Sequence, residues 1–298
     1  MIFLIASLIL TFLLTAFVSG NNMSAAVGTL IGSRIIGKNA GLSIGALGFI
    51  LGLVLEGDLL KNASYLLPDS YIYITYAFLI SFLIFIIAGI IRAPLSLTMA
   101  LAGTSIGISL RIAYKVDFSL IYKMVIFWII APLISIIASY LSEKAFFRNP
   151  RREVWRVASL IKLLLIVSSF FTAFTLGSNT LGFIAVIEGF NFKTIIIMVL
   201  AIIIGSFFLS SGVIKRVGQE MYLMRYSNAL VSLLVSSMLV EAATFFSVPL
   251  SNTQTLTSSV FGVGISYKYK AIYLKPFIII VSTWIIAPLL GLTLGYIA

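Results

Sequence analysis

Ten apolar stretches separated by short polar segments set the pattern of this 298-residue chain. Each runs for roughly 16 to 24 residues, about the length with which an α-helix crosses the hydrocarbon core of a bilayer. Five lie in the first half, at residues 1–18, 40–55, 71–91, 94–110 and 119–142, and five in the second, at 158–176, 194–212, 226–247, 250–266 and 275–297. The pattern predicts an all-α polytopic membrane protein of about ten spans.

Composition supports this prediction and limits the kinds of functional site that the chain can form. Hydrophobic residues make up 61% of the chain and charged residues 10%, against roughly 25% charged residues in soluble domains. The chain contains no cysteine and no histidine, which excludes disulfides, thiol chemistry and histidine metal sites. Without them no nucleophile–base pair or metal-ligand cluster can be assembled, so we do not expect an enzyme. The net charge of +11 comes without a basic stripe interleaved with aromatics, so nucleic acid is not an expected partner.

One clearly hydrophilic linker, residues 143–157, separates the two halves at 1–142 and 158–298. Its dense lysines and arginines place it on the cytoplasmic side of the membrane. If each stretch crosses the membrane, successive connections lie on alternating sides. This assignment puts 15 of the 20 basic residues inside and both termini outside. The first stretch lacks a basic n-region and a cleavage site, so we expect it to be retained as a span. The predicted location is the cell membrane, as a multi-pass protein.

The second half repeats motifs of the first at a nearly constant offset. Pro94-Leu95-Ser96 and Pro249-Leu250-Ser251 lie 155 positions apart, and the sequence Trp-Ile-Ile-Ala-Pro occurs at 128–132 and again at 284–288. An odd number of spans per half turns the second copy upside down in the membrane. Inverted repeats of this kind build many secondary transporters, with broken or re-entrant helices at the substrate site. We therefore expect the site where the two repeats face each other.

The two proline motifs have the chemistry of an anion site. Proline favours the first turn of a helix, where backbone N–H groups and the hydroxyls that follow can bind an oxyanion at the positive helix end. In the alternative, each proline begins an ordinary span whose Ser and Thr bond back to the helix. The sequence leaves open whether 94–110 and 250–266 are short spans or re-entrant hairpins, and whether Arg92 lies at the membrane edge or near the site. The candidate substrate-binding residues are Ser96, Leu97, Thr98, Ser251, Asn252 and Thr253.

A second pair of motifs places asparagines beside glycine, at positions 158 residues apart. Glycine next to amides permits unwound backbone whose oxygens can bind a small cation. The alternative is close packing of small residues, with asparagine bonding between helices. Glu241 stands inside a predicted span, where a carboxylate is expensive, so it is a candidate for proton or cation coupling, with a structural hydrogen bond as the rival. The candidate cation ligands are Asn21, Asn22, Asn179 and Thr180.

In this order the motifs resemble those of the inorganic phosphate transporter (PiT) family. Ser19-Gly20-Asn21-Asn22 and Gly177-Ser178-Asn179-Thr180 look like its two Gly-Ala-Asn-Asp motifs, and residues 94–99 and 249–254 look like its two Pro-Val-Ser-Thr-Thr-His motifs. The resemblance covers nearly the whole chain. It implies a cation-coupled importer of inorganic phosphate that works by alternating access in the lipid bilayer, with sodium as the only implied bound metal and no other cofactor, and it leaves a homodimer open.

The departures from the family pattern bear on the substrate and on the coupling ion. Asn22 and Thr180 replace the family aspartates, and Met99 and Gln254 replace its histidines. Losing two carboxylates makes the cation sites less negative, so sodium and proton coupling both stay open. Sulfate carriers occur in the family that the chain resembles, and a fully ionised sulfate needs no proton acceptor, so sulfate is the alternative substrate. An anion channel with these motifs as its filter is the second alternative.

Overall fold

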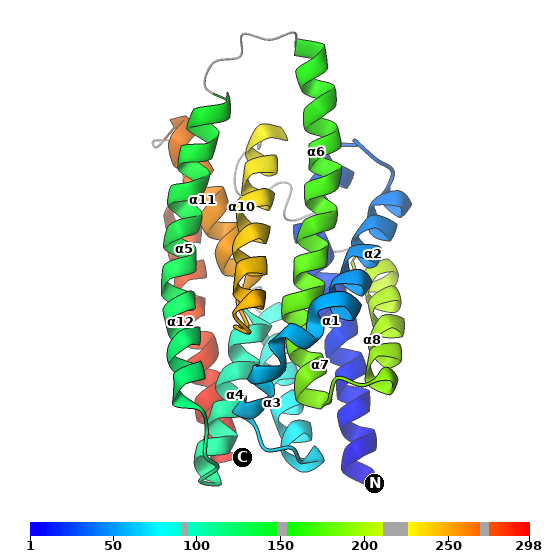
Figure 1. The fold of residues 1–298 in the computed structure, drawn as a ribbon, viewed down its shortest axis with the longest axis vertical. Coiled ribbons are helices and arrows are strands. Elements are labelled where there is room, and N and C mark those ends of the chain that lie inside the picture. The colour runs from blue at the N-terminus through cyan, green and yellow to red at the C-terminus, as the bar shows by residue number, and fades with distance from the viewer. Residues whose placement is uncertain (91–94, 148–153, 211–225, 269–273) are drawn as a thin grey trace.

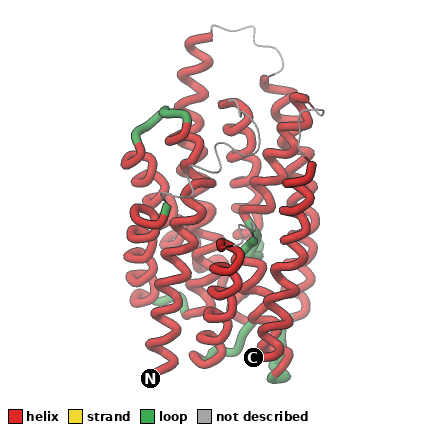
Figure 2. The backbone as a smooth tube through the Cα atoms, turned by 180° about the vertical axis from the view of Figure 1, so that it is seen from behind, coloured by secondary structure: helices red, strands yellow, loops and turns green. Residues whose placement is uncertain are grey.

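The computed structural model describes residues 1–90, 95–147, 154–210, 226–268 and 274–298. These residues form helices and connecting loops, and no strand occurs among them (Figure 2), which confirms the all-α prediction. Arg92, Pro94 and residues 148–153 of the predicted linker lie outside the described residues. The elements are α1 (Ile2–Gly32), α2 (Lys38–Glu56), the 3-10 helix η1 (Gly57–Leu66), α3 (Tyr71–Ile90), α4 (Leu97–Arg111), α5 (Phe118–Phe147), α6 (Val154–Thr175), the π-helix η2 (Leu176–Leu181), α7 (Gly182–Glu188), α8 (Phe192–Ile204), the π-helix η3 (Gly205–Leu209), α10 (Tyr226–Phe245), α11 (Asn252–Lys268) and α12 (Leu274–Ile297).

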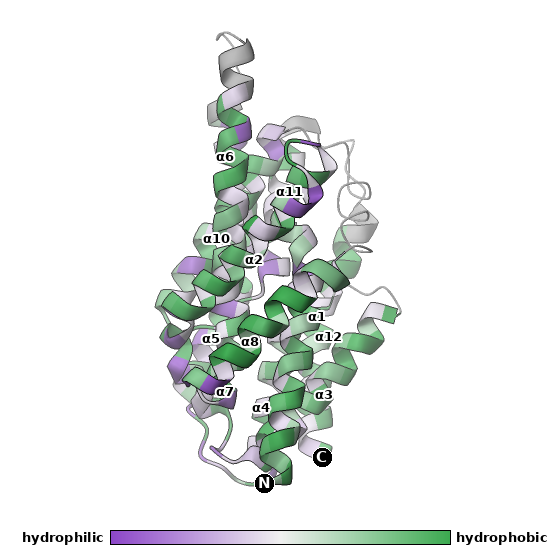
Figure 3. Cartoon of the chain, turned by 90° about the vertical axis from the view of Figure 1, so that its right-hand side faces the viewer, coloured by the Kyte–Doolittle hydropathy of each residue, from purple (hydrophilic) through white to green (hydrophobic). Residues whose placement is uncertain are grey.

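Eight described helical segments are long and apolar enough to cross a membrane, against the ten spans predicted. The predicted spans that fall short are α4 and α11, which have 15 and 17 residues. Apolar residues dominate the helices on the face seen in Figure 3, α8 among them. Helices of this length with apolar outer faces are suited to contact lipid, and they identify the chain as an integral membrane protein.

The two ends of the bundle carry different parts of the chain. Both termini lie at one end, and the ends of α5 and α6 that flank the central linker lie at the other (Figure 1). We call these the terminus end and the linker end. The sequence predicted that the termini share one side and that the linker lies on the opposite side, and the bundle has this arrangement. That the linker end faces the cytoplasm remains a prediction.

The short helices α4 and α11 form the second arms of two hairpins. In Figure 1, α3 and α4 occupy the lower half of the bundle, and α10 and α11 occupy the upper half. The tips of both hairpins are therefore near the middle, where Ser96 and Ser251 are buried. From these tips α4 runs toward the terminus end and α11 toward the linker end. Each hairpin thus reaches from one end of the bundle to about its middle, which is the geometry of a re-entrant hairpin.

Helices from the two halves of the chain are interleaved. The pairs α2 with α6, α1 with α8, α4 with α12, and α5 with α11 each join one half to the other. Glycines allow the closest of these contacts: a Cβ atom on Gly103 or Gly107 of α4 would lie 2.2 Å from a backbone oxygen of α12. The main core, with fully buried Phe49, Phe78 and Phe183, also draws on both halves. The boundary at 143–157 therefore divides the sequence without separating two compact bodies.

The backbone at the first asparagine motif differs from the prediction of a broken helix. α1 continues as a regular helix through Asn21, whereas Gly177–Thr180 lies in the π-helix η2. The glycine of the first motif serves packing, because a Cβ atom on Gly20 would lie 2.7 Å from the Cβ of Leu209. Nearby, the Ser19 hydroxyl donates to the carbonyl of Ala16 at 3.1 Å within the helix. Close helix packing, the alternative reading of this motif, accounts for the intact α1.

Candidate functional site

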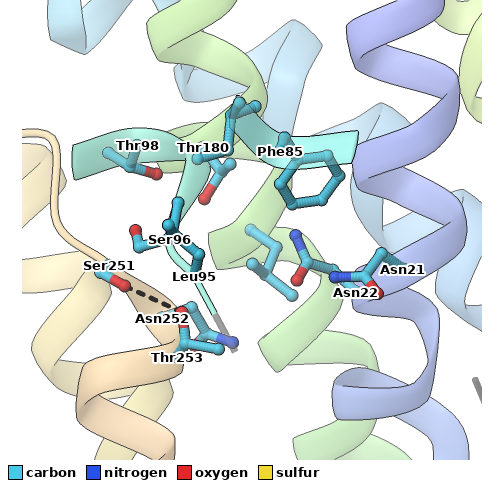
Figure 4. Close-up of a pocket in the computed structure, with 12 residues that line it drawn as sticks. Asn21, Asn22, Phe85, Leu95, Ser96, Thr98, Thr180, Ser251, Asn252 and Thr253 are labelled. Atoms are coloured by element: carbon cyan, nitrogen blue, oxygen red, sulfur yellow. Dashed lines mark hydrogen bonds between the residues drawn. The ribbon is translucent and has the colours of Figure 1, made fainter. Parts of the chain in front are cut away.

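One pocket near the hairpin tips collects four polar segments of the chain (Figure 4). The starts of α4 and α11 contribute the two proline motifs, α1 contributes two asparagines, and η2 contributes a threonine. The structure thus brings together nine of the eleven candidate site residues, while Asn179 and Glu241 lie outside the pocket lining. The lining residues are Asn21, Asn22, Phe85, Leu95, Ser96, Leu97, Thr98, Leu176, Thr180, Ser251, Asn252 and Thr253.

Two helix N-termini point into this pocket. Ser96 caps α4, since its Oγ accepts a hydrogen bond from the Met99 amide at 3.4 Å. At the start of α11, the hydroxyls of Ser251 and Thr253 are hydrogen-bonded to each other at 2.9 Å. The first amides of a helix have no intrahelical acceptor, and they carry the positive end of the helix dipole. Two sets of such donors therefore face one space from opposite sides.

The pocket lining is electrically neutral. Its side chains are hydroxyls, amides and apolar groups. Ser96 and Ser251 are buried, Asn22 is half-buried and Asn21 is exposed. In the described residues no cluster of three or more carboxylates forms a metal site. An anion in the pocket would bind amide and hydroxyl donors, and a cation would bind amide, hydroxyl or carbonyl oxygens.

Asn179 lies behind the pocket, with its whole amide group hydrogen-bonded. Its Nδ2 donates to Thr244 Oγ1 at 2.9 Å and to the carbonyl of Val248 at 3.0 Å. Its Oδ1 accepts from the amide of Leu250 at 2.8 Å. These bonds tie η2 to the segment that leads into α11. The geometry is that of an asparagine bonding between helices.

Trp128 on α5 holds the same segment from another side. Its indole Nε1 donates to the carbonyl of Pro249 at 3.0 Å, and the side chain of Gln254 donates to the carbonyl of Trp128 at 3.4 Å. Trp128 opens a duplicated motif that served the sequence analysis only as a marker of the repeat. In the second copy, the buried Nε1 of Trp284 has no partner in the described part of the chain. The two tryptophans therefore play different parts in this conformation.

Glu241 lies on α10 beside another carboxylic acid. It is 9% exposed, and Ser178 Oγ donates to its Oε2 at 3.5 Å. Glu56, the last residue of α2, lies near enough for its carboxyl group to interact electrostatically with that of Glu241. Two adjacent carboxyl groups can share a proton or hold a cation between them. Glu56 directly follows the predicted span at 40–55, and the sequence did not indicate this pair, because the two residues are distant in sequence.

A further buried carboxylate ties α7 to α1. Glu188 is 4% exposed and accepts hydrogen bonds from Ser7 Oγ at 2.8 Å and Thr11 Oγ1 at 3.3 Å. In the sequence, Glu188 falls between the predicted spans at 158–176 and 194–212. The available signal was the pair of hydroxyls four residues apart on the first apolar stretch, which share one helix face. The cluster is outside the pocket lining and joins the two helices.

Comparisons of the sequence and of the fold with known proteins both find phosphate transporters. Residues 143–295 match the phosphate transporter family. Over 176 residues the chain is 28% identical to a predicted phosphate permease of Methanocaldococcus jannaschii, with 57% of each chain covered. Over 86 residues it is 33% identical to the probable low-affinity inorganic phosphate transporter of Bacillus subtilis, covering 29% of this chain and 26% of that one. The first match therefore spans little more than half the length of that relative, and the second spans about a quarter.

A solved structure described as the sodium-dependent phosphate transporter has the same fold over nearly the whole length of both proteins. The TM-score is 0.84, with 100% of this chain and 99% of that chain covered. The sequence identity is 16%, so this likeness establishes the architecture of the helices alone.

Proposed function

The chain belongs to the phosphate transporter family, and from this premise we propose that it is a secondary transporter of inorganic phosphate, coupled to a cation and working by alternating access. The observation that carries the proposal is that the starts of α4 and α11 meet the asparagines of α1 and the threonine of η2 in one pocket. The substrate assignment rests on the family together with the chemistry of that pocket.

The anion is bound by neutral donors from both hairpins. Ser96, Leu97 and Thr98 face it from α4, and Ser251, Asn252 and Thr253 face it from α11, through hydroxyl, amide and backbone N–H groups. Each helix start contributes roughly half a unit of positive charge. The two together offset about one unit of a doubly charged hydrogenphosphate ion. A bound cation nearby offsets the remainder, which is a physical reason for coupling.

The coupling cation is sodium or a proton. Asn21, Asn22 and Thr180 bring oxygen atoms to the same pocket, so we assign them to a cation beside the anion. Asn179 holds the start of α11 in place, because both of its N–H donors and its carbonyl oxygen are hydrogen-bonded to the segment around α11 and to α10. The Glu56–Glu241 pair is the candidate site for a second charge that moves with the anion.

A carrier fits the burial of the pocket better than an open channel. Ser96, Thr98, Ser251 and Asn252 are at most 4% exposed, which disfavours a continuous aqueous pore. The two hairpins enter from opposite ends of the bundle, as inverted repeats require. Alternating access would then expose the pocket first to one side of the membrane and then to the other.

Transport into proteoliposomes tests the proposal. The purified chain is reconstituted, and uptake of labelled phosphate and labelled sulfate is followed under an imposed sodium gradient and, separately, an imposed proton gradient. We expect phosphate to accumulate above its external concentration under at least one gradient. Faster accumulation of sulfate would make the protein a sulfate carrier, and flux that only equilibrates the anion would indicate a channel. Failure to accumulate either anion under both gradients would defeat the carrier assignment.

A further inference from the structure

Five buried serines lie where α5, α10 and α11 pack together. They have no hydrogen-bond partner within the described residues, and each is at most 1% exposed. A buried hydroxyl without a partner destabilises the state in which it is buried. Five in one interface therefore suggest a second state in which they are bonded. We call this interface the serine seam, and its members are Ser135 and Ser139 on α5, Ser232 on α10, and Ser258 and Ser259 on α11.

The α5 serines point toward α10 and α11. Ser135 and Ser139 are one turn apart and share a helix face. Another face of α5 is exposed, with Leu133, Ile137 and Leu141 each more than half accessible. The extensive contacts of α5 with other described helices are those with α10 and α11. The buried serines therefore face these two helices.

The α10 side of the seam continues a set of bonded polar groups. Ser236 on α10 is hydrogen-bonded to Asn252 Oδ1 at 3.2 Å and to Thr255 Oγ1 at 2.8 Å, both on α11. Ser232 lies one turn from Ser236, and Ser259 lies one turn from Thr255, so both occupy the faces that meet at this contact. Ser232 and Ser259 therefore lie one helix turn further along α10 and α11 than the bonded residues.

The α11 side also meets α5. A Cβ atom on Gly262 would lie 2.3 Å from the carbonyl oxygen of Ile136, so α5 and α11 are in direct backbone contact there. Ser258 lies one turn before Gly262 and faces α5. This contact closes the seam in the present conformation.

The seam extends from the pocket to the linker end. At its inner end, Asn252 lines the pocket and bonds to Ser236 of α10. At its outer end, Ser227 Oγ of α10 donates to Glu143 Oε1 of α5 at 3.4 Å. In Figure 1, α10 and α11 occupy the upper part of the bundle, toward the linker end, and α5 runs the length of the bundle to that end.

We propose that the serine seam is the path by which the oxyanion passes between the pocket and the linker end. The inference rests on the proposed function, since it takes the pocket as the anion site. When α11 moves away from α5 and α10, the seam hydroxyls gain water and the anion as partners. Neutral hydroxyls suit transit, because they replace part of the hydration of the ion without holding it as a lysine or arginine would. The competing explanation is that serine serves here only as a small packing residue.

Single cysteines test the path, because the chain has no cysteine of its own. Ser139→Cys, Ser232→Cys and Ser259→Cys are reconstituted and exposed from each side to a membrane-impermeant thiol reagent, with and without phosphate. Exposed Lys144, near the linker end of α5, marks the side when replaced as Lys144→Cys. Ser206→Cys is the matched control, since Ser206 is equally buried and unpartnered in the described chain but lies in η3, which packs on α1.

We expect the seam cysteines to react from the Lys144 side at least about tenfold faster than Ser206→Cys, because the seam opens and the control does not. Phosphate should change the seam rates and leave the control rate unchanged. Seam rates equal to the control from both sides, or reaction only from the opposite side, would overturn the path.

Alanine variants provide a second measurement that does not depend on cysteine chemistry. Ser232→Ala and Ser259→Ala should lower the rate of phosphate uptake several-fold while phosphate binding to the purified protein stays unchanged. Ser206→Ala should alter neither quantity. Uptake at the wild-type rate in both seam variants would contradict the path. A wild-type chain that neither binds nor transports phosphate would instead count against the proposed function, and the labelling result would still show whether the seam opens.

Discussion

Trp128 and Asn179 hold the start of α11 from two sides without lining the pocket. Together they bond the backbone at Val248, Pro249 and Leu250. The donors of Ser251 to Thr253 follow directly in the chain. At the scale of single residues, the geometry of the anion site thus depends on side chains that the anion does not touch.

Replacing Trp128 by phenylalanine should weaken phosphate transport. The ring is kept, but the hydrogen bond to the Pro249 carbonyl is lost and a buried acceptor is left open, at a cost of roughly 1–3 kcal/mol. We expect a raised KM for phosphate uptake. Trp284→Phe is the control, because the indole N–H of Trp284 has no partner in the described part of the chain and its loss removes no such bond. Equal KM values in the two variants would contradict the positioning role of Trp128.

Glu241→Gln tests the coupling role of the buried carboxyl pair. Glutamine keeps an acceptor for the Ser178 hydroxyl but can neither carry a charge nor exchange a proton. We expect the dependence of uptake on pH or on sodium concentration to be lost or displaced, measured as initial rates over a range of each.

Glu188→Gln is the matched control for that experiment. Glu188 is also a buried carboxylate with hydroxyl donors, but it lies away from the pocket. Its substitution should leave both dependences in place. If Glu241→Gln transports phosphate with unchanged dependence on pH and on ions, the coupling role is excluded. The role of Glu241 is then a structural hydrogen bond alone.

The polar residues of the pocket could be predicted because they interrupt apolar stretches and recur at one offset. That reasoning found Ser96, Thr98 and Ser251 without knowledge of the fold. It missed the contact of Glu56 with Glu241 and the bond from Trp128, since both join segments far apart in the chain. Local pattern identifies which side chains are unusual, and tertiary packing decides what they touch.

At the scale of the helices, the backbones of α4 and α12 are in direct contact. Glycines on both helices permit this, among them Gly103 and Gly107 of α4 and Gly291 of α12. The contact fixes the arm that carries Ser96. The hydropathy pattern predicted the helices well because their lengths follow bilayer thickness. It predicted the backbone of the first asparagine motif less well, because α1 stays a regular helix there and packs closely at Gly20.

Gly107→Ala should destabilise the protein. Its Cβ atom would lie 2.2 Å from the carbonyl oxygen of Leu292, so α4 and α12 must move apart, at a cost of roughly 1–3 kcal/mol. Thermal unfolding in detergent should show a lower Tm. Gly89→Ala is the control, because a Cβ atom there meets nothing within 4 Å and alanine favours the helix. A Tm for Gly107→Ala at or above that of Gly89→Ala would contradict the close contact.

The whole molecule interleaves its two halves around one pocket. α4 of the first half packs on α12 of the second, and α11 of the second packs on α5 of the first. The duplicated motifs predicted that the two halves face each other, but hydropathy carries no information on which helices pair. The central claim that follows is that both hairpin starts bind one and the same anion.

Equilibrium binding of labelled phosphate to the purified chain tests this claim most directly. We predict one phosphate per chain, and we predict that Thr98→Val and Thr253→Val each weaken that single site by about tenfold or more, through loss of a hydroxyl bond to a charged group. Thr104→Val, on the same helix as Thr98 but outside the pocket lining, should bind as the unmodified chain does. Two phosphates per chain, or a site that either pocket variant leaves unchanged, would contradict the shared site.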